Sequence, residues 1–469
     1  MQRSNVMIGY RFYLFPMEKL SKKEDTQTVA VIGLGYVGLT LATIFAEVGK
    51  KVVGVDQNET IVDMLSNGIA HFYEPGLEEK MLAFKDRLVF RTGIPQENSL
   101  CVYIISVGSN LSEMGEPDYS HIDTASIDIA DKLKKGDLVI LRSTVPIGTT
   151  RSRVIPNLEK YSGLIAGKDF FVAFAPERTI EGKALEELRT LPQLIGGYTK
   201  ACRDKTEQLF SEISQHIVLF DTLEEAELSK LISNSYRDFS FAFANSIALI
   251  ASEHNINIHT VISGANDGYK RNNIPLPSPG VGGYCLTKDP QLLAYGAKKY
   301  QLARDLIYAG RAVNALMPTH VADMIDEFTR EVYKGEIPHI IIAGLAFKGA
   351  PATSDVRHSP SYELIELLQS RGYGKISGYD PHVSPDVFKD WRIGRIEELH
   401  EVPENGDIVI LMHRSAHYEN INFATAWAQQ KNKLLVDPWG MYNHERAMMS
   451  AEDIVYANLS YNSKHDMYE

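Results

Sequence analysis

Residues 29–42 read Val-Ala-Val-Ile-Gly-Leu-Gly-Tyr-Val-Gly-Leu-Thr-Leu-Ala. A short apolar, β-branched run leads into the pattern Gly-x-Gly-x-x-Gly at residues 33–38, and a helical pattern of apolar residues follows. A second predicted strand, 51–55, ends at Asp56. The order of strand, glycine turn, helix, strand and acidic residue is typical of a dinucleotide-binding unit, in which backbone N–H groups at the helix N-terminus bind a pyrophosphate.

Asp56 helps to distinguish between NAD and NADP as the bound dinucleotide. A carboxylate at this place hydrogen-bonds the adenosine ribose, whereas a nearby arginine would accommodate a 2′-phosphate. Gln57 and Asn58 follow Asp56, and neither is an arginine. The sequence therefore predicts NAD rather than NADP.

Strand and helix patterns continue to alternate after this unit. The predicted strands are 101–107, 138–141 and 171–175, with a predicted helix at 122–133. Such alternation favours a mostly parallel, doubly wound sheet, in which ligands bind beyond the carboxyl ends of the strands. Segments 142–146 and 176–178 follow two of these strands, so we expect them at a binding site.

A long helix is predicted from about residue 221 to 254, where Thr222 and Glu225 have the spacing of a capping box at its start. It is longer than one dinucleotide-binding half needs. We therefore expect it to link two halves and to offer apolar faces to a second subunit. Lys230 and Asn234 lie four residues apart on one face; they are either a solvated lysine beside a polar neighbour or a functional pair.

The last third of the chain repeats the alternation. Predicted elements are strand 339–343, helix 360–370 and strands 376–379, 407–412 and 434–436. Gly-Leu-Ala-Phe-Lys-Gly at 344–349 stands where the first half has its glycine motif, and Lys348 there suits a phosphate-bearing ligand. The polar tail from Asn458 is expected to be mobile.

The predicted fold class is thus α/β, with two Rossmann-like doubly wound domains joined by a central helical domain that contains a long helix. The predicted boundaries are 1–27 for an N-terminal extension, 28–215 for the NAD-binding domain, 216–330 for the central helical domain and 331–469 for the second Rossmann-like domain.

Composition excludes several classes of protein. The chain has 469 residues, 44% of them hydrophobic, and a net charge of −12, which is ordinary for a soluble globular protein and argues against a nucleic-acid groove. Cys101, Cys202 and Cys285 are widely spaced and odd in number. They match neither a disulfide framework nor a zinc site, and they suit a reducing compartment.

The apolar run at residues 6–15 is short, is broken by Arg11 and has no cleavage site after it, so we interpret it as an extension, with Met17 as an alternative start. No other apolar run is long enough to span a bilayer. We therefore expect a cytoplasmic protein that uses no metal and has no membrane or nucleic-acid partner.

Pro-Gly-Val-Gly-Gly-Tyr-Cys-Leu-Thr-Lys-Asp-Pro at residues 279–290 places a cysteine behind a glycine-rich turn. Lys288 is close enough to help stabilise a Cys285 thiolate, and Asp289 could direct a proton or a water molecule. The alternative is a tight loop with a buried, inert cysteine.

A nucleophilic cysteine is needed when an aldehyde must be oxidised further: the thiolate adds to the carbonyl carbon, and water later releases a thioester. Lys230 and Asn234 could then stabilise the oxyanion, and a carboxylate would activate the water.

Taken in order, the motifs resemble those of the nucleotide-sugar 6-dehydrogenases, the family of UDP-glucose and UDP-N-acetylhexosamine dehydrogenases. The resemblance extends from Val29 to about Met441. It rests on Val-Ile-Gly-Leu-Gly-Tyr-Val-Gly-Leu (31–39), Glu-Pro-Gly-Leu (74–77), Ser-Thr-Val-Pro (143–146), Pro-Glu-Arg (176–178), Lys-Leu-Ile-Ser-Asn (230–234), Gly-Val-Gly-Gly-Tyr-Cys (280–285), Gly-Leu-Ala-Phe-Lys (344–348) and Asp-Val-Arg-His-Ser-Pro (355–360).

The resemblance implies roles for individual residues. The implied catalytic residues are Cys285 as nucleophile, Lys230 and Asn234 at the oxyanion, Asp289 in proton transfer or water activation, Glu177 in thioester hydrolysis and Thr144 in positioning a water molecule. The implied NAD contacts are Gly33, Gly35, Tyr36, Val37, Gly38, Asp56, Thr144, Glu181, Lys288 and Arg357. The implied substrate contacts are Glu177, Arg178, Thr179, Lys230, Asn234, Arg271, Gly282, Phe347 and Lys348, with Arg271 a candidate for reaching into a neighbouring subunit's site.

The activity that the resemblance implies is oxidation of the C6 hydroxyl of a UDP-sugar to a uronic acid, with two NAD reduced per sugar, in surface polysaccharide synthesis. It also implies a homodimer or higher homo-oligomer, a dimerisation role for the central domain and UDP-sugar binding by the last domain. Pro-Glu-Arg at 176–178 is typical of the N-acetylhexosamine enzymes, since an arginine can donate to an N-acetyl carbonyl or a phosphate. UDP-N-acetyl-D-mannosamine is our first choice, with UDP-N-acetylglucosamine and UDP-glucose as alternatives.

The sequence departs from the family pattern at Tyr284, at Ser109 and Asn110, and at Thr40, and it combines a Lys-Asp pair typical of glucose enzymes with Pro-Glu-Arg. These departures bear on the substrate rather than on the reaction. More distant alternatives are a β-hydroxyacid dehydrogenase, which oxidises once and has no such cysteine, and a non-catalytic nucleotide-sugar sensor.

Overall fold

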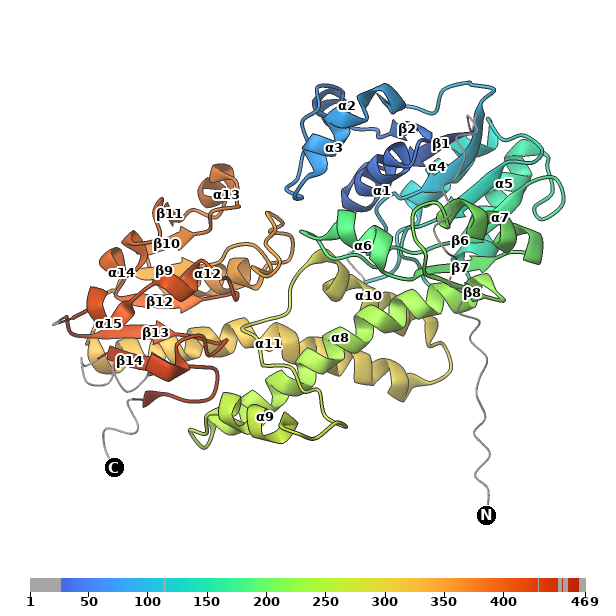
Figure 1. The fold of residues 1–469 in the computed structure, drawn as a ribbon. Coiled ribbons are helices and arrows are strands. Elements are labelled where there is room, and N and C mark those ends of the chain that lie inside the picture. The colour runs from blue at the N-terminus through green and yellow to red at the C-terminus, as the bar shows by residue number, and fades with distance from the viewer. Residues whose placement is uncertain (1–26, 113–114, 429, 446–448, 450–453, 464–469) are drawn as a thin grey trace, which may run out of the picture. The chain divides into compact units, whose positions relative to one another are not determined.

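The computed structural model describes residues 27–112, 115–428, 430–445, 449 and 454–463 (Figure 1). The predicted N-terminal extension lies outside these residues except for Gln27. The described residues fall into two compact units. The first comprises residues up to His71, Pro75–Asn110 and Pro117–Lys230, and the second comprises Phe72–Glu74, Leu111–Glu116 and the residues from Leu231 onward.

The first unit is built on an eight-stranded sheet with the order β3-β2-β1-β4-β5-β6-β7-β8. The strands are β1 (Thr28–Ile32), β2 (Lys51–Val55), β3 (Leu88–Arg91), β4 (Leu100–Ile105), β5 (Leu138–Leu141), β6 (Phe171–Phe174), β7 (Gln193–Gly197) and β8 (Ile217–Phe220). Neighbouring strands are parallel except β6 and β7, which are antiparallel. From β1 the chain adds β2 and β3 on one side, and it then crosses back to place β4 on the other side of β1. The switch point where ligands bind therefore lies between β1 and β4.

Helices cover this sheet. They are α1 (Tyr36–Glu47), α2 (Glu59–Ser66), α3 (Leu77–Ala83), α4 (Ser120–Ala130), α5 (Ile155–Ser162), α6 (Ala184–Thr190) and α7 (Lys200–Phe210), with the 3-10 turn η1 (Lys85–Arg87) and the π-helical turn η2 (Thr150–Val154). Ala30 and Ile32 of β1 belong to one core cluster with Ile129 of α4 and Leu158 of α5. The strands expected from the apolar runs are confirmed to within two residues at their ends.

The second unit contains a six-stranded, entirely parallel sheet with the order β11-β10-β9-β12-β13-β14. Its strands are β9 (Ile340–Ala343), β10 (Ile376–Tyr379), β11 (Gly394–Arg395), β12 (Ile408–Leu411), β13 (Lys433–Val436) and β14 (Ile454–Ala457). Ile340 and Ile342 pack on one face with residues of the neighbouring helices, whereas Ile341 and Ala343 pack on the other. Because both faces are covered, β9 is a continuous apolar run without alternation.

The helices that follow the first unit include two of unusual length. They are α8 (Leu223–Ser252), α9 (Ile258–Asn266), α10 (Tyr284–Gly296), α11 (Gln301–Val332), α12 (Pro360–Ser370), α13 (Pro385–Asp390), α14 (Glu401–Asn405) and α15 (Phe423–Ala426), with 3-10 turns η3 (Tyr418–Asn420) and η4 (Asn443–Glu445). The two units divide within α8, between Lys230 and Leu231. The long helix was predicted, whereas the 32-residue α11 was not.

The predicted capping box of α8 is confirmed. The N–H of Thr222 donates to Glu225 Oε2 at 2.9 Å, and the N–H of Glu225 donates to Thr222 Oγ1 at 3.2 Å. The two residues thus satisfy each other's backbone donors at the helix start.

The expectation of a mobile tail from Asn458 is wrong for residues 458–463. Asn458 is buried, its Oδ1 accepts from the N–H groups of Ser460 (2.9 Å) and Tyr461 (3.0 Å), and its Nδ2 donates to Asn257 at 3.1 Å. Polar residues here form an internally hydrogen-bonded turn instead of a solvated tail. Residues 464–469 lie outside the described part of the chain.

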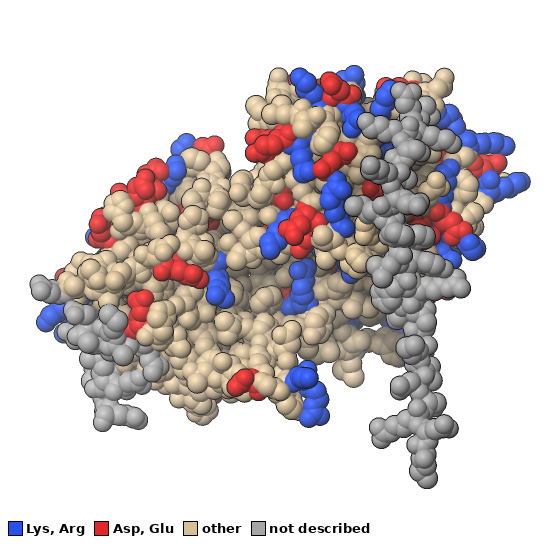
Figure 2. All heavy atoms as spheres, in the orientation of Figure 1, with Lys and Arg blue, Asp and Glu red and all other residues tan. Residues whose placement is uncertain are grey.

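The face of the molecule in Figure 2 carries acidic and basic side chains interspersed over the first unit, without separation by sign. Within the described residues, no helix is both long and apolar enough to cross a membrane. Across the same residues, no group of three or more His, Cys, Asp or Glu side chains could hold a metal ion.

Candidate active site

The glycine turn joins β1 to α1, and its three glycines serve three different purposes. Gly33 has φ +89°, and a Cβ there would lie 2.8 Å from the backbone of Val107. A Cβ on Gly38 would overlap the carbonyl oxygen of Gly33, so this glycine lets the helix pack on the strand. At Gly35 a Cβ would meet no atom within 4 Å. The second glycine therefore leaves an open backbone surface, which a pyrophosphate can approach closely.

Asp56 lies beside this turn at the end of β2. Its Oδ2 accepts from the N–H of Leu34 at 2.9 Å, and its Oδ1 accepts from the N–H of Asn58 at 3.0 Å. These bonds fix the carboxylate and leave lone pairs that can accept from ribose hydroxyls. Helix α1 has no side-chain cap and no acidic residue in its first turn, so its first N–H groups can bind an anion.

Tyr36 connects the turn to the segment that follows β6. Its hydroxyl oxygen accepts from the N–H of Gly182 at 2.8 Å, which brings the neighbouring Glu181 toward the turn. Val37 follows in the first turn of α1. The NAD contacts predicted in these segments therefore lie in one part of the first unit, and their geometry fits a dinucleotide.

Thr144 lies in the segment after β5 and is held to the segment after β4. Its carbonyl oxygen accepts from Ser109 Oγ at 2.6 Å, and the adjacent Ser143 Oγ donates to the carbonyl oxygen of Val107 at 2.7 Å. Ser109 was noted in the sequence only as a departure from the family pattern, and the structure gives it this positioning contact.

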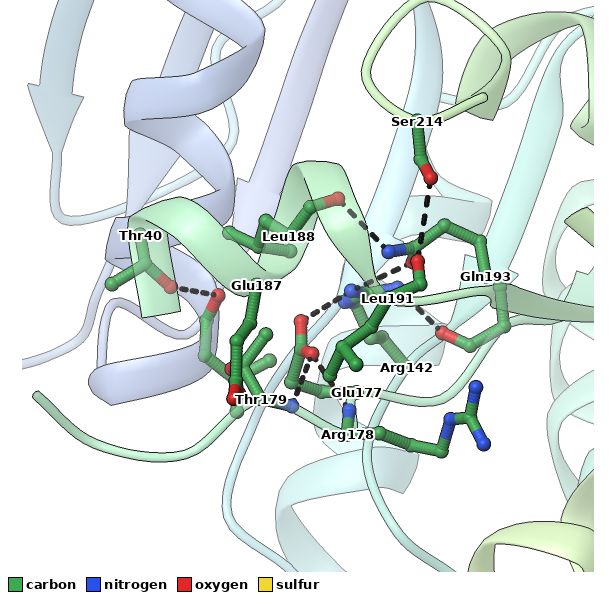
Figure 3. A network of polar contacts seen from close by, with 12 residues as sticks. Thr40, Arg142, Glu177, Arg178, Thr179, Glu187, Leu188, Leu191, Gln193 and Ser214 are labelled. Atoms are coloured by element: carbon green, nitrogen blue, oxygen red, sulfur yellow. Dashed lines mark hydrogen bonds and ion pairs between the residues drawn. The ribbon is translucent and has the colours of Figure 1, made fainter. Parts of the chain in front are cut away.

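Glu177 lies in a network just beyond β6 (Figure 3). Its Oε1 accepts from the N–H groups of Arg178 (2.6 Å) and Thr179 (2.8 Å), and its Oε2 accepts from the Arg142 guanidinium. Burial raises the pKa of Glu177, but the charge of Arg142 and the backbone donors outweigh it, so the pKa lies below its ordinary value. The carboxylate is therefore ionised although it is buried.

Arg178 and Lys230 are the other predicted substrate contacts in the first unit. Arg178 is partly buried and donates through Nη2 to the carbonyl oxygen of Pro192 at 2.6 Å. Burial lowers its pKa, although the charge of Glu177 opposes this. Lys230 is buried on α8.

Cys285 is the second residue of α10 and is exposed, so the alternative of a buried cysteine is wrong. Gly283 before it has φ +84°, and a Cβ there would lie 2.7 Å from the ring of Phe347. A Cβ on Gly282 would overlap the carbonyl oxygen of His358. The glycine-rich turn thus packs tightly against segments 344–349 and 355–360, and it places the cysteine at a helix N-terminus, where negative charge is favoured.

Asp289 joins the cysteine helix to α8. It is fully buried, its Oδ1 lies 2.9 Å from Lys288 Nζ, and its Oδ2 accepts from Asn234 Nδ2 at 2.5 Å. Asn234 Oδ1 in turn accepts from Arg237 Nη2 at 2.6 Å. The two neighbours fix the orientation of the Asn234 amide, and its second N–H can donate a further hydrogen bond. Sequence reasoning missed Arg237, although its i+3 spacing from Asn234 is a signal for it.

Phe347 and Lys348 follow β9 in the second unit. Lys348 Nζ lies 5.7 Å from the centroid of the Phe347 ring. The Arg357 guanidinium lies 5.0 Å from the centroid of the Tyr284 ring and pairs with Asp355 at 2.6 Å, so Arg357 is beside the start of the cysteine helix.

Arg271 lies in the segment between α9 and α10. Its guanidinium is 4.7 Å from the centroid of the Tyr269 ring.

Comparisons with known proteins match three domains of one family along the chain. The NAD binding domain of the UDP-glucose/GDP-mannose dehydrogenase family matches residues 27–214, the central domain matches 224–316 and the UDP binding domain matches 341–444. A UDP-N-acetyl-D-mannosamine dehydrogenase from Pyrococcus horikoshii is 32% identical over 87% of this chain and 94% of its own length. An NDP-N-acetyl-D-galactosaminuronic acid dehydrogenase from Ralstonia nicotianae is 30% identical, over 90% of this chain and 98% of that protein.

Solved structures show the same fold. That of the UDP-N-acetyl-D-mannosamine dehydrogenase from Pyrococcus horikoshii has a TM-score of 0.79 at 31% identity, over 88% of this chain and 95% of that one. A UDP-glucose dehydrogenase from Pyrobaculum islandicum also has a TM-score of 0.79, at 27% identity, over 96% of this chain and 100% of that one. The resemblance inferred from the motifs is confirmed: the chain belongs to the UDP-glucose/GDP-mannose dehydrogenase family and is an NAD-dependent nucleotide-sugar dehydrogenase.

Proposed function

We propose that the protein oxidises the C6 hydroxyl of a UDP-N-acetylhexosamine to the uronic acid through a covalent intermediate on Cys285, for surface polysaccharide synthesis. The observation that carries this proposal is the exposed thiol of Cys285 at the N-terminus of α10, one turn before the Asp289–Asn234 hydrogen bond. Such an environment favours a thiolate and supplies an amide donor, which are the requirements for addition to an aldehyde.

Each step of the proposed reaction is assigned to residues of this chain. The glycine turn and Asp56 would hold NAD, which would supply the hydride acceptor for both oxidations. Between them, the Cys285 thiolate adds to the C6 aldehyde, while Lys230 and Asn234 stabilise the oxyanion until it is protonated. After the second oxidation, water attacks the thioester, the C–S bond breaks and the thiolate leaves. The alcohol, two NAD⁺ and one water thus give the carboxylate, two NADH and three protons.

Asp289, Glu177 and Thr144 are assigned to the proton and water steps. Asp289 would assist proton transfer at the cysteine, Thr144 would position the hydrolytic water and Glu177 would act in thioester hydrolysis. The ionised state of the Glu177 carboxylate supports a role as acceptor of a hydrogen bond from the hydrolytic water.

For the substrate, we propose UDP-N-acetyl-D-mannosamine first, with UDP-N-acetylglucosamine and UDP-glucose as alternatives. Curated relatives named UDP-N-acetyl-D-mannosamine dehydrogenase and the Pro-Glu-Arg motif at 176–178 support this order. The proposed substrate contacts are Glu177, Arg178, Thr179, Lys230, Asn234, Arg271, Gly282, Phe347 and Lys348. Thr144, Glu181, Lys288 and Arg357 are proposed as further NAD contacts.

We further propose a homodimer that pairs through α8. Ile232, Tyr236, Phe239, Phe243 and Ile250 form one apolar stripe along this helix and are each 41–68% exposed. Their spacings of four, three, four and seven residues are those of a coiled-coil seam, in which each such helix faces another. A second copy of α8 therefore fits this stripe. The domain boundaries predicted from the sequence (28–215, 216–330 and 331–469) are proposed as the functional division.

A panel of UDP-sugars with NADH counted per sugar consumed tests the reaction and the substrate together. We expect two NADH per sugar and the highest kcat/KM with UDP-N-acetyl-D-mannosamine. One NADH per sugar would instead indicate a single oxidation, as in a β-hydroxyacid dehydrogenase. Tight binding without NADH formation for any UDP-sugar would indicate a sensor.

A further inference from the structure

Arg142 is fully buried at the carboxyl end of β5, where an arginine is costly unless it is paired. Its Nη1 donates to the carbonyl oxygen of Ala175 at 2.9 Å, and its Nη2 donates to Glu177 Oε2 and to Gln193 Oε1, the latter at 3.4 Å. Its guanidinium carbon lies 5.2 Å from the centroid of the Phe210 ring. Three acceptors and one ring, from three segments of the chain, therefore hold this guanidinium in one place. Figure 3 shows Arg142 beside Glu177 and Gln193.

The Glu177 carboxylate links Arg142 to the backbone of the segment that follows β6. Its other oxygen accepts from the N–H groups of Arg178 and Thr179, so the carboxylate closes the segment 177–179 on itself. If the carboxylate rotated, both N–H groups would lose their partner. The path of this segment therefore depends on where Arg142 holds the carboxylate.

We propose that Arg142 is a positioning residue of the dehydrogenase: it fixes the orientation of the Glu177 carboxylate and, through Glu177, the backbone of residues 177–179. The inference rests on the proposed function, which gives Glu177, Arg178 and Thr179 their places at the substrate. Arg142 itself touches no reacting atom in this proposal.

The pair also determines the protonation state of Glu177. Burial alone raises the pKa of this carboxyl, and the charge of Arg142 is the largest effect that lowers it. Without the arginine, Glu177 becomes protonated at a higher pH, and every step that needs its carboxylate fails as the pH falls. A purely structural role for Arg142 would instead reduce the rate by the same factor at all pH values.

The test compares Arg142→Gln, Arg142→Lys, Glu177→Gln and the double variant Arg142→Gln/Glu177→Gln. Arg153→Gln is the matched control, because Arg153 pairs with Asp123 at 2.6 Å in the same unit but is 45% exposed. The UDP-sugar that gives the highest rate in the panel is used throughout. The readouts are kcat between pH 5.5 and 9, acyl-enzyme by intact-protein mass spectrometry, and hydrogen exchange of the amides of residues 177–179 in the protein without ligands.

We expect Arg142→Gln to lower kcat roughly 10- to 100-fold near pH 6 and less at pH 9, to accumulate acyl-enzyme and to speed exchange of the 178 and 179 amides. Arg142→Lys should restore much of the rate, because it keeps the charge, and the double variant should be no slower than Glu177→Gln alone. Arg153→Gln should behave as wild type. If Arg142→Gln destabilises the fold, Arg142→Lys and the double variant, which leave no unpaired carboxylate, carry the same comparison.

If Glu177→Gln is impaired, two results would overturn this inference while leaving the proposed role of Glu177 standing. The first is a kcat for Arg142→Gln that equals the wild-type value at every pH, or that is lower by the same factor at every pH. The second is a double variant much slower than Glu177→Gln, because Arg142 would then act on something other than Glu177. Wild-type turnover by Glu177→Gln would instead overturn the proposed role of Glu177.

Discussion

At the scale of single residues, reactivity here depends on how each group is held. Arg237 bonds the amide oxygen of Asn234 and Asp289 bonds its amide nitrogen, so the orientation of this amide is fixed. The proposed mechanism uses the remaining N–H of this amide as a donor to the oxyanion. Cys285 is exposed, and the glycine-rich turn before it packs so closely on Phe347 that no side chain fits at Gly283. The chemistry is therefore set by neighbours as much as by the reactive residues themselves.

Cys285→Ser should stall the reaction. An alkoxide is a poorer nucleophile and an oxygen ester hydrolyses less readily than a thioester, so we expect kcat to fall by at least about 100-fold. NADH per sugar should drop from two towards one, or a sugar adduct should persist in the intact-protein mass spectrum. Cys101→Ser is the control, because Cys101 lies on β4 in the other unit. Full turnover by Cys285→Ala with two NADH per sugar would contradict the covalent mechanism.

At the scale of elements, the turn between β1 and α1 shows how one motif combines folding with binding. Gly33 and Gly38 are required by the packing of the chain on itself, whereas Gly35 is surrounded by open space. The motif therefore contains two structural glycines and one that is kept small for a ligand. Substitutions within it should separate the two requirements.

Gly35→Ala should fold normally and bind NAD at least about tenfold more weakly, because the added methyl occupies space against which a pyrophosphate lies. Gly38→Ala should lower the melting temperature of the free protein, since its Cβ would overlap the carbonyl oxygen of Gly33. Calorimetric titration with NAD and thermal unfolding measure the two effects. Normal NAD affinity in Gly35→Ala would show that the cofactor does not approach this glycine.

At the scale of the whole molecule, two units share one continuous helix, α8. One side of this helix packs on α11, through the Asp238–Arg311 ion pair at 2.5 Å and the Asn245–Asn314 hydrogen bond at 2.9 Å. The apolar stripe of α8 is left exposed in the single chain, although such area is normally covered. This contrast is the basis of the dimer proposed above.

Phe243→Glu should convert the dimer to a monomer, because it places a charge at the middle of the apolar stripe, where pairing would bury it. Light scattering coupled to gel filtration gives the mass directly, and far-UV circular dichroism checks that the helices remain. Glu253→Lys, one residue beyond the end of α8, should leave the mass unchanged. A wild-type protein that is monomeric at micromolar concentration would refute the proposal.

Much of this protein could be read from local sequence. The glycine motif, the apolar runs and Asp56 predicted the cofactor and five of the eight strands of the first sheet, because each is a local requirement: a positive φ, a strand buried on both faces, an acid at a strand end. Strands β3, β7 and β8 were not predicted. The order of the motifs predicted the family. The candidate site residues were named from those motifs. The structure brings Glu177, Arg178 and Thr179 into one network, and Asn234 and Asp289 into another beside Lys288.

Tertiary structure alone decided the rest. The pairing of Arg142 with Glu177 arises because β5 and β6 are neighbours in the sheet, and residues 35 positions apart in the chain carry no local signal of such contact. The same holds for Asp289 with Asn234, which are 55 positions apart, and for the buried turn at Asn458. The periodicity of apolar residues indicates which face of a helix or strand is buried. The partner of a buried polar group depends instead on which elements become neighbours in the folded chain.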